Sequence, residues 1–96
     1  SDASDDKVDE IIREVLHNAV HPEIFADCYV AIQKNLMPDW YRKEIGLSKV
    51  RLALTDTLDN GTPMGRAVAK RAAHSIVTKI VNAIAQESNT ATSDNS

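Results

Sequence analysis

The residues best suited to chemistry are a single cysteine and two histidines close to it in the sequence. Cys28 is the only cysteine of the 96-residue chain, and His17 and His21 precede it. Nucleophilic catalysis needs the thiol within reach of a base that a third group orients. Cys28, however, falls on the apolar face of a predicted helix, where a buried thiol is inert. We therefore predict a structural role for Cys28 and no catalytic residue.

The same two histidines stand four residues apart, a spacing that suits two metal ligands on one continuous helix. Pro22 directly follows His21 and disfavours helical geometry there. No other group of Cys, His or Asp supplies further ligands at a recognisable spacing. The stretch 56–67 fails as a calcium loop, because Leu58 and Ala67 take positions that require oxygen ligands. We predict neither a metal site nor a cofactor.

The strongest candidate for a binding site is a row of basic residues on the last predicted helix. Arg66, Lys70 and His74 repeat every four residues, which places them on one helix face. Arg71 lies beside them. Such a row can neutralise phosphates or bind an acidic peptide, although interleaved bases more often form a solvated helix face. The nearby bases that would extend this surface are Lys49, Arg51 and Lys79.

A second candidate combines aromatic and basic side chains. Trp40 and Tyr41 are followed directly by Arg42 and Lys43. Aromatic residues and arginine are enriched at binding hot spots. The alternative is that Trp40 covers the edge of the core, the commoner role of a lone tryptophan. Trp40, Tyr41 and Lys43 are therefore the second set of candidate partner-binding residues.

The segments that position these residues are predicted to be helical. Apolar residues recur at intervals of three and four over 5–19, where Ser4 or Asp5 can cap the helix. A second helix is predicted over 22–36, with Pro22 at its first position.

The middle of the chain carries mixed signals. A short helix is predicted to open at Pro38, contain Trp40 and end at Gly46 as its C-cap. The next segment, about 48–58, fits a helix, but apolar residues over 49–55 also alternate as in a strand. We favour the helix, because no second strand pattern is present to pair with it.

The last helix is predicted over about 63–86, after a turn at 59–61, with Thr62 as its N-cap and Pro63 at its first position. Its apolar face is wide, which indicates contacts with two neighbours in one domain or with a second copy of the chain. The predicted stripe contains Met64, Ala67, Val68, Ala72, Ile76, Ile80 and Ile84. The residues assigned to a candidate homodimer contact are Ile76, Ile80 and Ile84.

Length and composition predict one domain over 5–86, with disordered segments at 1–4 and 87–96 that lack large apolar side chains. The net charge of −3 is unevenly distributed, since residues 1–33 carry −6 and residues 34–79 carry +5. This separation favours a basic surface for an anionic partner, unless the acidic first helix neutralises it.

The cysteine count and the hydropathy of the sequence indicate which cellular compartment to expect. A single cysteine suits a reducing compartment, so we expect a soluble intracellular protein of the cytoplasm or nucleus. The chain has no run of about 18 apolar residues, so no membrane partner is expected.

These features together predict an all-α array of four or five helices with a long C-terminal helix. The predicted function is a non-catalytic interaction or assembly module, adaptor or regulatory, that binds another protein and is a candidate homodimer. The alternative is a small DNA- or RNA-binding regulator, with a helix-turn-helix built from about 48–58 and 63–74. The acidic overall pI of about 5.5 counts against that alternative.

Overall fold

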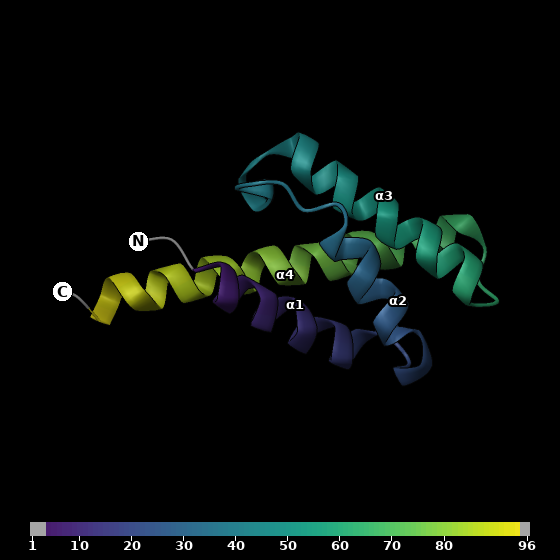
Figure 1. The fold of residues 1–96 in the computed structure, drawn as a ribbon, viewed down its shortest axis with the longest axis horizontal. Coiled ribbons are helices and arrows are strands. Elements are labelled where there is room, and N and C mark those ends of the chain that lie inside the picture. Colours follow the sequence, from purple (N-terminus) through teal and green to yellow (C-terminus); the bar gives the residue numbers. More distant parts are fainter. Residues whose placement is uncertain (1–3, 95–96) are drawn as a thin grey trace.

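The regular structure of the chain is helical, as Figure 1 shows. The computed structural model describes residues 4–94. Within that range the elements are α1 (Asp5–Ala19), α2 (Pro22–Gln33), the short 3-10 helix η1 (Trp40–Arg42), α3 (Glu44–Gly61) and α4 (Arg66–Asp94). The prediction of a small all-α array with a long C-terminal helix is confirmed.

Helix α1 begins and ends where the sequence predicts. The hydroxyl of Ser4 accepts a hydrogen bond from the backbone N–H of Lys7 at 3.2 Å, which satisfies one unpaired amide of the first turn. Asp5 and Asp6 then lie where the helix dipole favours negative charge. The buried residues recur at intervals of one, three and four along one face: Val8, Ile11, Ile12 and Leu16.

Helix α2 starts with Pro22 at its first position, as predicted, and ends at Gln33, three residues before the predicted end. Its buried face consists of Ile24, Cys28 and Ile32. Phe25 is half-buried rather than central to that face, and its ring stacks on His17 of α1 at 3.9 Å between centroids. This stacking pins the start of α2 against the end of α1.

The segment 38–46 differs from the prediction. Trp40 lies in η1, and α3 already begins at Glu44, so Gly46 lies inside α3 rather than at a C-cap. The reason for the glycine is close approach: a Cβ at this position would lie 2.5 Å from the backbone oxygen of Trp40. Asp39, just before η1, adopts a left-handed backbone with φ of 57°, a conformation that Asp tolerates better than most residues.

The segment 49–55 is helical, as we favoured, and α3 continues through the predicted stop signal to Gly61. Thr62 does not open the last helix. Its hydroxyl donates to the backbone oxygen of Leu58 at 2.7 Å and so closes the end of α3. The last helix begins only at Arg66, where the carbonyl of Gly65 accepts the first helical bond, from the N–H of Ala69.

Helix α4 is longer than predicted, since it passes Gln86 and runs to Asp94. The predicted disordered tail, 87–96, therefore overlaps α4, and residues 95–96 lie outside the described residues. The predicted disordered segment 1–4 also lies outside them, except for Ser4.

The helices contact one another in sequence around a single core. α1 packs on α2, α2 on α3 and α3 on α4, and α4 returns to pack on α1. The two neighbours of α4 account for its wide apolar face. Its most buried residues are Ala69, Ala73, Ile76, Val77, Ile80 and Ile84. The predicted stripe is wrong at Ala67 and Val68, which are exposed because they lie on the far side of the helix from α1 and α3.

Crossing a lipid bilayer takes a long, uninterrupted apolar helix, and none of the helices described between residues 4 and 94 meets that requirement.

Candidate interaction groove

A groove of about 560 Å³ lies between α3 and α4. The two helices form a hairpin joined by residues 62–65, so side chains that are far apart in sequence line its two walls. The α3 wall consists of Ser48, Arg51, Leu52 and Thr55, and the α4 wall consists of Arg66, Lys70, Arg71 and His74. The four basic-row residues predicted from the sequence thus all line one wall of the groove.

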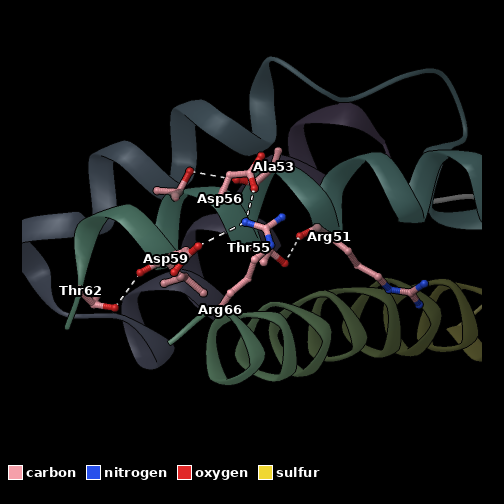
Figure 2. A network of polar contacts seen from close by, with 9 residues as sticks. Arg51, Ala53, Thr55, Asp56, Asp59, Thr62 and Arg66 are labelled. Atoms are coloured by element: carbon pink, nitrogen blue, oxygen red, sulfur yellow. Dashed lines mark hydrogen bonds and ion pairs between the residues drawn. The ribbon is translucent and has the colours of Figure 1, made fainter. Parts of the chain in front are cut away.

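The side chain of Arg66 is engaged within the chain, although the sequence predicted it as a partner-binding residue. Figure 2 shows its side chain reaching from the start of α4 to two carboxylates on α3. Its Nη1 lies 2.9 Å from Oδ1 of Asp56 and 3.3 Å from Oδ2 of Asp59. Hydrogen bonds to Asp56, then to Asp59, raise the pKa of the guanidinium above its ordinary value. Arg66 therefore ties the hairpin together at this end, and its charge is already balanced.

Arg51 occupies the groove from the α3 side. Its Nη1 donates to Oε1 of Glu44 at 3.1 Å, while its Nε is buried without a hydrogen-bond partner among the described residues. In Figure 2 the side chain extends from α3 toward α4, whose residues line the other wall of the groove. Thr55, one turn later, is 3% exposed and donates its hydroxyl to the backbone oxygen of Arg51 at 2.7 Å. Because its own polar group is satisfied, Thr55 adds little polarity to the groove.

Three basic side chains of the α4 wall have no such partner. Lys70, Arg71 and His74 are exposed, and within residues 4–94 none of them makes an ion pair or hydrogen bond. Across the groove, Leu52 is 56% exposed, which is high for a leucine on a helix that packs against two others. The middle of the groove therefore joins uncompensated positive charge with an exposed aliphatic side chain. We call these four residues, Leu52, Lys70, Arg71 and His74, the groove centre.

The structure does not bring the second predicted set, Trp40, Tyr41 and Lys43, into this groove. Trp40 is 3% exposed and packs against α3 at Gly46, so it covers the core edge as in the alternative reading. Tyr41 is half-buried, and the guanidinium of Arg42 lies 5.8 Å from its ring centroid. Lys43 is exposed, directly precedes α3 and is not one of the residues that line the groove.

Trp40 and Tyr41 instead line a different hollow of about 430 Å³. Three aspartates, Asp5, Asp9 and Asp39, are also part of its wall. The carboxylate of Asp9 already has partners within the chain, because it accepts hydrogen bonds from Tyr29, Arg13 and Gln33. This hollow is acidic where the α3–α4 groove is basic, so the two predicted sets do not form one site.

The residues assigned to a homodimer contact are inside the chain's own core. Ile76 is 4% exposed, Ile80 is 0% exposed and Ile84 is 2% exposed. They belong to α4, which packs against α1 and α3, so these three side chains are not accessible to a second copy in the folded chain. Assigning a dimer contact to these three residues does not fit their burial.

The remaining chemical candidates occupy structural positions. Cys28 is fully buried, and burial raises the pKa of its thiol to about 11, which keeps it protonated and unreactive. His17 stacks on Phe25, and His21 precedes Pro22 outside the helix. Among the residues that the structure describes, no group of three His, Cys, Asp or Glu side chains could hold a metal ion.

The sequence reasoning found the α4 wall and missed most of the α3 wall. Arg51 was anticipated as an extension of the basic surface, whereas Lys49 and Lys79 do not line the groove. For Leu52 and Thr55 the sequence pattern predicts only a place in a helix or a strand. The available signal was that Leu52 falls off the face defined by Val50, Leu54 and Leu58, which places it outside the core.

Comparison with protein-family models, with curated proteins and with solved structures found no significant match for this chain.

Proposed function

We propose that this chain is a non-catalytic interaction module that binds an acidic segment of a partner protein in the α3–α4 groove. The observation that carries the proposal is the groove centre. Three basic side chains without intramolecular partners face an exposed leucine there. Interfaces combine an apolar contact with a rim of charge that sets orientation and partner choice.

The number of uncompensated charges favours a protein partner over nucleic acid. Arg66 is balanced by Asp56 and Asp59, and Arg51 by Glu44, so Lys70 and Arg71 supply the permanent excess charge at the groove. The logarithm of the binding constant for duplex DNA falls with the logarithm of salt concentration, with a slope of roughly −0.9 for each phosphate that the protein neutralises. Proteins whose binding is strongly salt-dependent make about 6–10 such phosphate contacts. Two free cations support only a weak association with a duplex.

The geometry of Arg66 also counts against the helix-turn-helix alternative. A recognition helix places its N-terminal residues against base edges. Here the first residue of α4 is held by two carboxylates of α3, which would repel a phosphate backbone at that end. A nucleic-acid function would therefore require these ion pairs to break first.

The test is a titration of the full chain with a fluorescein-labelled acidic peptide that contains leucines, followed by anisotropy. The double variant Lys70→Glu, Arg71→Glu should weaken binding about tenfold or more, since each exposed ion pair contributes roughly 0.2–1 kcal/mol and reversal adds repulsion. Lys79→Glu is the matched control. It makes the same charge change on the same helix, at an exposed position that does not line the groove.

Three outcomes decide the proposal. Peptide binding that is lost in the double variant and kept in Lys79→Glu supports it. Equal weakening by both changes would show a general effect of net charge and would contradict the groove assignment. Binding to a random-sequence duplex with a steep salt dependence, in the absence of peptide binding, would establish the nucleic-acid alternative instead.

A further inference from the structure

Two exposed aliphatic side chains lie on one face of α3. Ile45 is 60% exposed and Leu52 is 56% exposed. They are seven residues apart, which places them within about 20° of each other around the helix. At a rise of about 1.5 Å per residue, they are separated by about 10.5 Å along α3. Leu52 and Ser48, which lies between the two, line the groove, whereas Ile45 does not, so this apolar line begins in the groove and extends past its end.

The basic wall faces this line across the groove. Lys70, Arg71 and His74 come from α4, whereas Leu52 and Ser48 come from α3. Among the described residues, the other exposed large aliphatic side chains are Val30 and Val68, which belong to α2 and α4 and so are not part of this line on α3. The surface therefore has one apolar edge and one basic edge. A complementary occupant needs an apolar edge that faces α3 and an acidic edge that faces α4.

We infer that the occupant is an amphipathic α-helix of a partner protein, with two aliphatic residues seven positions apart and acidic residues along the edge that faces α4. This inference rests on the proposed function and specifies the form of the segment that is bound. A helix repeats its apolar face at about 10.5 Å every seven residues, which matches Ile45 and Leu52. An extended segment repeats one face at about 6.8 Å, and then at twice that distance, so it matches neither side chain in register.

The experiment uses three acidic peptides of about 18 residues, a length at which a helix is marginal alone and forms on binding. The first has two leucines seven positions apart with glutamates on one flanking edge. The second has the same numbers of leucines and glutamates, but its leucines are two positions apart and a proline replaces one central residue. The third replaces both leucines with serine. Anisotropy gives each affinity, and circular dichroism measures the helix formed on binding.

The first peptide should bind at least tenfold more tightly than the other two and gain helix when it binds. Leu52→Ser and Ile45→Ser should each weaken it several-fold without changing the fold, because both side chains are exposed. Val68→Ser is the matched control, because Val68 is 44% exposed and lies outside the groove. Its affinity for the first peptide should equal that of the unmodified chain.

Each contrary result has a separate meaning. Equal affinity for the first and second peptides overturns the helical occupant and leaves the proposed function standing. If no acidic peptide binds, both the helical occupant and the proposed function are refuted. Self-association of the chain that Leu52→Ser abolishes, measured by sedimentation, would show that a second copy covers the groove and would also overturn the inference.

Discussion

Replacing Gly46 with alanine tests the packing of η1 on α3. In an unobstructed helix this change stabilises by about 1 kcal/mol, because alanine has the better helix propensity. Gly46 is helical and has no left-handed backbone to preserve. Sequence reasoning alone would therefore recommend the substitution.

The structure reverses that expectation. The new Cβ would lie 2.5 Å from the backbone oxygen of Trp40, 2.6 Å from its Cα and 2.9 Å from its Cβ. Carbon atoms at rest are about 3.5–4.0 Å apart, so η1 must move by roughly 1 Å. Trp40 is 3% exposed and would move with it. Overpacking of this kind costs about 1–3 kcal/mol, and the upper half of that range applies because the two nearest obstructing atoms belong to the backbone. After subtraction of the propensity gain of about 1 kcal/mol, we expect a net loss of about 1–2 kcal/mol.

The assay is urea unfolding followed by circular dichroism and by the fluorescence of Trp40, the only tryptophan of the chain. With a slope of about 1 kcal/mol per molar urea for a protein of this size, the midpoint should fall by about 1–2 M. Gly65→Ala is the control, because a Cβ there meets nothing within 4 Å, and its effect should stay within about 0.5 kcal/mol. A Gly46→Ala variant as stable as the unmodified chain would refute the close approach.

Two further substitutions and one labelling experiment probe other parts of the structure. Ile80→Ala should lower the free energy of unfolding by about 2–5 kcal/mol, because the side chain is fully buried, and a loss below 1 kcal/mol in urea unfolding would contradict its central position. Hydrogen bonding by Tyr29 and then Arg13 lowers the pKa of Asp9 below 3.8. The ionised carboxylate of Asp9 therefore stabilises the folded chain above that pH, and this contribution is lost as the pH falls. The urea midpoint of Asp9→Asn should therefore change less than that of the unmodified chain between pH 5 and about pH 2.5. Cys28 should react with a thiol reagent at pH 8 only after unfolding in urea, because burial raises its pKa to about 11; rapid labelling of the folded chain would refute that burial.

Local signals were sufficient where an element is defined by its own residues. The bounds of α1 agree with the predicted range of about 5–19, because Ser4 caps it, acids fill its first turn and apolar spacing stops before Pro22. The start of α2 followed from Pro22 for the same reason. These features act within one or two turns of the residues that carry them.

Local signals failed where one residue type fits two different roles. Gly46 was assigned to a C-cap because glycine usually ends helices, but here it admits the backbone of Trp40. Thr62 was assigned to an N-cap, yet its hydroxyl binds backward to Leu58. Both residue types fit either role, and only the packed helices decide between them.

The same division holds for the candidate site. The four-residue spacing of Arg66, Lys70 and His74 predicted one wall of the groove. Spacing could not reveal that Arg66 is paired across the hairpin, because that depends on how α3 turns Asp56 and Asp59 toward it. It also could not give the opposite wall, which exists only once α3 lies beside α4.

The pairing of the first and last helices determines how the fold responds to force. α1 and α4 run antiparallel, so the start of α1 and the far end of α4 lie on the same side of the molecule (Figure 1). Lys7 and Glu87 form an ion pair at 4.0 Å near that end. A pull between these two ends would load one turn of the interface at a time, starting at Lys7. The two helices would then separate turn by turn rather than slide past each other.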